Sequence, residues 1–166
     1  MKRATKIIAV VDDRSSRFGT ITLTREDRYR RRVALRTDQG DAFLLDLPEA
    51  TYLADGVGLD LDQGGVVIVR AADEELFEIS APDVLTLMRI AWHIGNRHTP
   101  AEVLANAIYI QPDHVLADMV RGLGGSVAVV TRAFEPEGGA YGGYGSLERG
   151  HHHGAGHHHP HVHDHT

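Results

Sequence analysis

The first 70 residues contain short runs of β-branched and alternating apolar side chains, a pattern typical of β-strands. The strands that it predicts cover residues 5–11, 19–24, 31–37, 41–47 and 65–70. Turn-forming sequences separate several of these runs. The glycines in 38–40 and 62–65 predict tight hairpin turns, because glycine readily adopts a positive φ. We therefore expect residues 1–72 to form a β-rich domain with one solvated, arginine-rich face.

After residue 70 the pattern changes to alternating strands and helices. Residues 71–77 are predicted to be a hinge. Apolar residues at spacings of three and four predict two helices, which start at 81–82 and 112–113 and end at 95–96 and 124–125. The strands predicted around them cover residues 76–80, 101–104, 107–111 and 126–132. The order βαββαβ over residues 73–134 predicts a ferredoxin-like domain, so the fold class of the chain is α+β.

The end of the chain, residues 135–166, is rich in glycine and histidine. Nine of the twelve histidines lie within residues 151–166, with almost nothing apolar between them. Such a segment has no hydrophobic face to offset the entropy of ordering it. We therefore expect a flexible glycine-rich tether followed by a disordered tail. The tail histidines are His151, His152, His153, His157, His158, His159, His161, His163 and His165.

Neutral imidazole is a good ligand for nickel, copper, zinc and cobalt, so this tail predicts metal binding. The alternative explanation is an engineered purification tag. A tag is not favoured, because no run is longer than three histidines and Gly, Ala, Pro, Val and Asp interrupt the runs. The chain contains no cysteine, which excludes thiolate sites. We expect any metal to be held by nitrogen and oxygen ligands.

Composition narrows the class of protein. With 166 residues, of which 42% are hydrophobic, the chain can form one ordinary domain or two small ones around a packed core. No apolar run approaches the roughly 20 residues needed to span a membrane, so no membrane association is expected. The apolar run at residues 7–11 is too short for a signal peptide, and a cytoplasmic protein is expected.

The net charge of −6 is unevenly distributed. Residues 1–36 hold eleven of the seventeen Lys and Arg residues and only four acidic residues. A surface that binds nucleic acid usually carries interleaved aromatic residues, and Tyr29 is the only one in the densest basic stretch, residues 25–36. We expect this stretch to be a solvated face or a surface that docks a protein, and we expect no nucleic-acid partner.

Three histidines lie outside the tail. His93 is predicted to be a packed or partly exposed histidine of the first helix with no ligand role. His98 follows the end of that helix, where a loop or cap contact is favoured over a ligand role. His114 follows Asp113 in the first turn of the second helix, where the positive end of the helix dipole favours the neutral, ligating imidazole. Asp118 lies one turn further on the same face and could orient the ring or add an oxygen ligand.

One histidine cannot make a selective metal site. In a two-fold dimer, however, the same residue occurs twice at the symmetry axis, so one His114 per chain supplies two facing ligands. A catalytic zinc site would need three ordered ligands close together and an open position, and the sequence outside the tail supplies no such cluster. A metal hydrolase is therefore disfavoured, and we expect no enzyme activity.

Three stretches of the chain resemble the UreE family of urease accessory proteins. They are AWHIGNRHTPAEV at 91–103, IQPDHVLADMVRGLGGSV at 110–127 and FEPEGGAYGG at 134–143, and a histidine-rich end follows them. The resemblance implies a nickel metallochaperone that delivers nickel to apo-urease together with the other accessory proteins, including a GTPase. It also implies a protein-docking amino-terminal domain and a ferredoxin-like domain that forms a homodimer.

The resemblance places the family's metal-binding histidine in the DHVL motif, which is His114 here, contributed by both chains of the dimer. It implies that the tail histidines add ligands or carry further nickel. Some family members have a second histidine pair on the last strand, but that strand reads SVAVVTR in this chain, so no second site is expected there.

Two functions fit these residues, a carrier and a store. A carrier must bind nickel tightly enough to capture it and loosely enough to release it, which two imidazoles with a mobile tail can do. The alternative is a passive store of nickel, zinc or copper in which the tail is the whole function. Sites made of nitrogen and oxygen bind copper more tightly than nickel, so zinc and copper are expected to bind in vitro as well.

Overall fold

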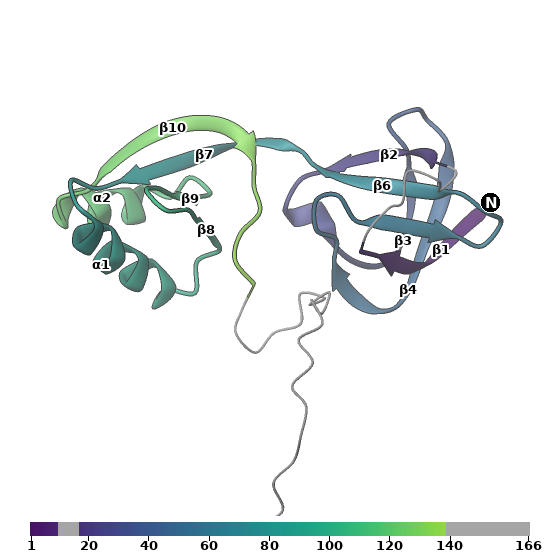
Figure 1. The fold of residues 1–166 in the computed structure, drawn as a ribbon, viewed down its shortest axis with the longest axis horizontal. Helices are drawn as coiled ribbons and strands as arrows, with labels where there is room; N and C mark the ends of the chain where they lie inside the picture. Colours follow the sequence, from purple (N-terminus) through teal and green to yellow (C-terminus); the bar gives the residue numbers. More distant parts are fainter. Residues whose placement is uncertain (10–16, 139–166) are drawn as a thin grey trace, which may run out of the picture.

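The computed structural model describes residues 1–9 and 17–138 (Figure 1). The predicted tail and all nine of its histidines lie outside the described residues, as does most of the predicted tether. The described part has the predicted α+β composition. It contains one six-stranded sheet without a long helix and one four-stranded sheet with two helices.

The first sheet confirms the β-rich amino-terminal half. Its strands are β1 (Lys2–Ile8), β2 (Arg17–Leu23), β3 (Tyr29–Arg36), β4 (Ala42–Tyr52), β5 (Gly58–Leu61) and β6 (Val66–Ala71), and a short 3₁₀ helix, η1 (Glu26–Arg28), precedes β3. The order across the sheet is β2-β6-β5-β1-β4-β3. Both predicted hairpin turns are confirmed. β3 pairs antiparallel with β4 through a turn at Gly40 (φ 98°), and β5 pairs antiparallel with β6 through Gly64 (φ 81°).

The sheet curls around an apolar core, to which most of its strands contribute. The fully buried members are Ala4, Phe43, Leu45, Leu53, Leu59, Val67 and Val69. Two strand pairs, β1–β4 and β2–β6, are parallel, which the local pattern did not predict. The partners of a parallel pair are far apart in the chain, so no turn sequence between them predicts the pairing. The pairing depends instead on the core that the strands share.

Strand β5 was not predicted, and β4 runs five residues further than expected. The predicted strand ended at Leu47, and the next residue is Pro48, whose ring removes a donor from the hydrogen-bond ladder. In the structure, the register between β3 and β4 shifts between Arg30 and Arg32, and Pro48 has no paired partner there. The proline therefore lies in a bulge, where its missing donor costs no hydrogen bond.

The second sheet has the predicted βαββαβ order. Its elements are β7 (Asp73–Ser80), α1 (Val84–Gly95), β8 (Ala101–Val103), β9 (Ile108–Ile110), α2 (His114–Gly122) and β10 (Ser126–Ala133). The sheet order β10-β7-β9-β8 and its antiparallel pairs are those of a ferredoxin-like domain, so this expectation is confirmed. Both helices pack on one face of the sheet in a single core that includes Ile79, Ile90, Ile108, Leu116 and Val120.

The predicted hinge at 71–77 is wrong. Strand β6 ends at Ala71 and β7 begins at Asp73, so Ala72 alone separates them, and its N–H donates to the Leu23 carbonyl at 2.8 Å. The acidic residues at 73–75 favour a polar linker, because apolar and polar side chains do not alternate there. This segment is nevertheless a strand, since β7 pairs with β10 along its full length. Tertiary pairing overrides the weak local preference here.

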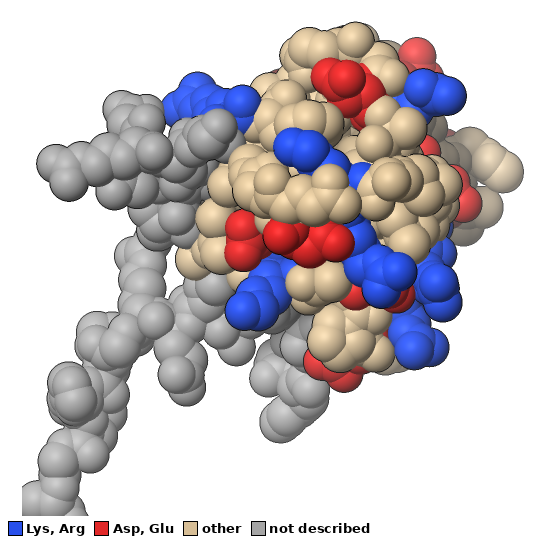
Figure 2. Space-filling model, turned by 90° about the vertical axis from the view of Figure 1, so that its right-hand side faces the viewer, with Lys and Arg blue, Asp and Glu red and all other residues tan. Residues whose placement is uncertain are grey.

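The basic excess of the first domain is interrupted by acidic groups on its surface (Figure 2). Arg3 and Arg32 both pair with Asp46 at 3.5 Å, and Arg30 pairs with Asp27. The arginine-rich strand β3 is therefore a mixed-charge face. Among residues 1–9 and 17–138, no helix is long and apolar enough to cross a membrane.

Candidate metal centre

His114 lies in the first turn of α2, as the sequence predicted. It is the first residue of the helix and is exposed. Asp113 caps this helix, because its carboxylate accepts hydrogen bonds from the N–H groups of Val115 at 2.9 Å and Leu116 at 3.0 Å. A capped first turn has a defined backbone, since two of its otherwise unpaired donors are satisfied. The imidazole of His114 is thus presented to solvent from a fixed position.

Asp118 lies one turn along α2 from His114 and is also exposed. Its carboxylate accepts a hydrogen bond from Arg121 at 3.2 Å. An exposed ion pair of this kind is weak and readily exchanged for another partner. The idea that Asp118 orients the His114 ring or adds a ligand stays a prediction.

The other two histidines of the described chain lie elsewhere in this domain. The His93 ring meets the Trp92 ring edge-on, with centroids 5.0 Å apart. His98 is exposed after the end of α1 and adopts a left-handed backbone conformation (φ 54°), in which its N–H donates to the Gly95 carbonyl at 3.0 Å. Within residues 1–9 and 17–138, no three His, Cys, Asp or Glu side chains gather around one point as a metal site would require.

The two helices expose an apolar surface that the sequence pattern did not separate from the core. α1 buries Leu87, Ile90 and Ile94 against the sheet. On its other side, Leu85, Met88 and Trp92 follow the helical spacing and are 56%, 63% and 66% exposed. Val115, beside His114 on α2, was predicted to share the helix's apolar side and is exposed as well. We call Val84, Leu85, Met88, Trp92 and Val115 the helix face.

A buried arginine joins the two domains. Arg28 of η1 is fully buried, its guanidinium pairs with the Glu135 carboxylate and donates to the Phe134 carbonyl, and it lies over the Tyr52 ring at 5.0 Å. Burial lowers the pKa of Arg28 below its ordinary value, because the charged form loses solvation, although nearby carboxylates oppose this effect. We call Arg28, Phe134 and Glu135 the interdomain joint.

Residues 4–72 match the family model described as the UreE urease accessory protein, N-terminal domain, and residues 74–165 match the model of the C-terminal domain. The chain belongs to the UreE family of urease accessory proteins. It is 47% identical over 165 residues to the urease accessory protein UreE of Chelativorans sp., covering 99% of both chains. It is 49% identical over 166 residues to that of Azorhizobium caulinodans, covering 99% of this chain and 76% of the relative.

Membership of the UreE family makes the chain an accessory protein and not an enzyme, as expected. The structure also gives positions to the three stretches that suggested the family. The sequence GNRH lies at the end of α1 and contains His98. The sequence DHVL lies at the start of α2 and contains His114, and FEPE follows β10. The first two stretches carry histidines, whereas the third makes the interdomain joint.

The residues around the joint were not identified from the sequence. Glu102 is 9% exposed, accepts from Arg132 at 2.7 Å and accepts from the Glu135 N–H at 3.1 Å. Arg132 in turn lies over the Tyr109 ring at 4.0 Å, and the Tyr109 hydroxyl donates to Glu78 at 2.7 Å. This hydrogen bond, together with burial, raises the pKa of Tyr109. The FEPE motif was the one sequence feature that pointed to this region. It does not indicate that Glu135 pairs with Arg28, which is distant in the chain.

Proposed function

We propose that this protein is a nickel metallochaperone that delivers nickel to apo-urease during assembly of the urease metal centre. The observation that carries the proposal is the exposed His114, held by the capped start of α2 in a chain of the UreE family. The site is completed by the His114 of a second copy, with the tail histidines as additional ligands. A cytoplasmic location and contacts with the other accessory proteins, including the GTPase, stay predictions from the resemblance.

The helix face supports a homodimer. Large apolar side chains that remain exposed together mark a surface that another protein covers. Here they lie on the two helices that share one core, and Val115 is the chain neighbour of His114. A two-fold contact between helix faces would bring the two His114 side chains close to the axis. That arrangement supplies two imidazoles although one chain has no three-ligand cluster in its described part.

The dimer is tested by Met88→Asp, which places a charge in the middle of the helix face. We expect the variant to be monomeric at concentrations at which the parent protein is dimeric, because an unpaired carboxylate would have to be desolvated in the interface. Sedimentation equilibrium measures the change. The matched control is Arg89→Gln, which alters the net charge equally at a neighbouring exposed position outside the helix face. A dimer that survives Met88→Asp unchanged places the interface elsewhere.

Delivery distinguishes a carrier from a passive store. A carrier must hold nickel at a site from which apo-urease can take it. Two imidazoles leave open positions in the coordination shell, and these allow an acceptor's ligands to bind before the first bonds break. A store requires nothing beyond the tail histidines. Selectivity for nickel over copper and zinc then depends on geometry and on the metal available, because the affinity order alone favours copper.

The test is activation of apo-urease with a limiting amount of nickel supplied bound to the protein. We expect urease activity to appear with the parent protein and to fall at least about tenfold with His114→Ala, since only the tail would then carry the metal. Apo-urease, the other accessory proteins and GTP are present in both reactions. Equal activation by both proteins would support the store and contradict the carrier.

A further inference from the structure

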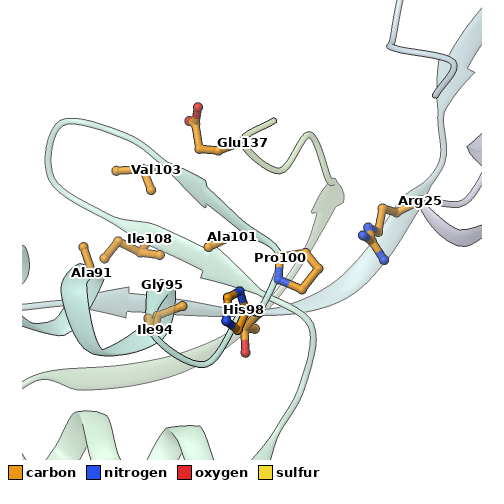
Figure 3. A pocket seen from close by; sticks show the side chains of 11 residues that line it. Arg25, Ala91, Ile94, Gly95, His98, Pro100, Ala101, Val103, Ile108 and Glu137 are labelled. Carbon is orange, nitrogen blue, oxygen red and sulfur yellow. The ribbon is translucent and has the colours of Figure 1, made fainter. Parts of the chain in front are cut away.

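A groove with a volume of about 420 Å³ lies beside the interdomain joint (Figure 3). Ile94 of α1, Val103 of β8 and Ile108 of β9 form its apolar wall, and Arg25, which precedes η1, lies at one end. His98 and Glu137 also line it. Val103 and its neighbour Leu104 are 45% and 43% exposed at the rim. An apolar hollow with exposed aliphatic side chains around it is a binding surface.

The charged end of the groove has an unused donor. The Arg25 N–H is occupied, since it donates to Glu74 at 2.7 Å. The Nε of its side chain is buried, and no hydrogen-bond partner meets it in the described part of the chain. Its guanidinium is directed toward the groove near Pro100 (Figure 3). A group that fits this hollow therefore has an apolar body and a polar group that accepts a hydrogen bond from the guanidinium, as a tyrosine with its hydroxyl does.

The last described residues of the chain lie beside this groove. After the interdomain joint, Pro136 is buried and the Glu137 N–H donates to the Ala101 carbonyl at 2.7 Å. Glu137 is part of the groove lining, so the described chain ends, at Gly138, on the groove's edge. Among residues 139–166, the large apolar or aromatic side chains are Tyr141, Tyr144, Leu147 and Val162. Tyr141 comes first, and four residues from Glu137 reach at most about 14 Å.

We infer that the groove binds Tyr141 of the same chain, with the ring against Ile94, Val103 and Ile108 and its hydroxyl toward Arg25. The segment that begins at the interdomain joint thus continues across the groove before the histidine-rich residues start. The chain that precedes the histidine-rich residues would then be held beside His98, between the two domains. This inference goes beyond the proposed function and does not depend on metal binding, so its test uses the metal-free protein.

The test is methyl and aromatic NMR on the full-length, metal-free protein. We expect cross-relaxation between the Tyr141 ring and the methyl groups of Ile94 and Ile108. These signals should be lost, with shifts of the same methyl resonances, in Tyr141→Ala. Tyr141→Phe should retain them, because the ring is kept. Tyr144→Ala is the matched control and should leave the methyl resonances unchanged.

Three outcomes overturn the inference. The first is the absence of any contact between Tyr141 and these methyl groups, and the second is an equal effect of Tyr144→Ala. The third is a contact that appears only between differently labelled copies in a mixed sample, which would make the occupant a second chain. Tyr141 lies outside the packed residues described above, so its substitution leaves both cores intact and the result interpretable.

Discussion

A chain that ends at Gly150 should bind about one nickel ion per pair of chains, and His114→Ala should abolish that binding. The shortened chain keeps every described residue and loses all nine tail histidines. His114 is the expected ligand because the capped start of α2 holds it at an exposed position. Isothermal titration calorimetry with nickel measures both the number of ions and the affinity.

His98→Ala is the matched control in the same shortened chain. His98 is also exposed, but it lies after α1 and lines the groove, whose lining contains no residue of α2. We expect it to leave the nickel affinity of the shortened chain within about twofold of the parent value, whereas loss of an imidazole ligand removes most of the binding. Loss of binding in His98→Ala with retention in His114→Ala would move the site to the groove.

The pH dependence of this binding follows from its ligands. Imidazole binds a metal only in its neutral form, and a histidine ordinarily gains a proton below a pKa of about 6.5. Nickel affinity should therefore fall steeply between about pH 7 and pH 5.5, because protons compete with the metal. An affinity that stays constant over this range would argue for carboxylate ligands.

Glu135→Ala should destabilise the protein by about 2 kcal/mol, because it leaves the buried guanidinium of Arg28 without its carboxylate. Breaking a fully buried pair typically costs more, but the Glu135 side chain is 35% exposed and water can partly replace it. Urea denaturation, followed by circular dichroism, measures the free energy of unfolding. Glu137→Ala is the control, since that side chain is exposed only two residues further on.

A double variant tests whether the pair itself is responsible. Arg28→Met removes the charge and fills much of the same space, and apolar replacement of both partners of a buried pair is often nearly neutral. We expect Arg28→Met with Glu135→Ala to lose clearly less stability than the sum of the two single variants. Simple additivity would mean that each side chain acts through separate contacts, such as the hydrogen bond from Arg28 to the Phe134 carbonyl.

Local pattern predicted the elements that have strong local signals. The helices were found because apolar residues recur at three and four, and because Pro112 and Asp113 favour a helix start. The structure shows that Asp113 is the N-cap of α2. Both hairpin turns of the first domain were found from their glycines. The order βαββαβ was enough to indicate the ferredoxin-like domain, since few other arrangements accommodate it.

The errors occur where partners distant in sequence decide the structure. Asp73–Phe77 was taken for part of a hinge, yet β10 makes it a strand. The helical spacing of apolar residues did not distinguish Leu85 from Leu87. In the structure, the sheet buries Leu87, whereas Leu85 stays exposed on the helix face. The spacing of apolar residues cannot show which side of such a helix is buried, because apolar residues lie on more than one side. The buried side is decided by the element that packs against the helix.

The sequence by itself therefore determined the fold class, the family and the position of His114 at a helix start, because each follows from residues close together in the chain. Only the tertiary structure decided which apolar side chains of the two helices stay exposed. It also decided that Glu135 meets Arg28, more than 100 residues away. Such a contact depends on how two separate cores pack against each other, and no short stretch of sequence contains that information.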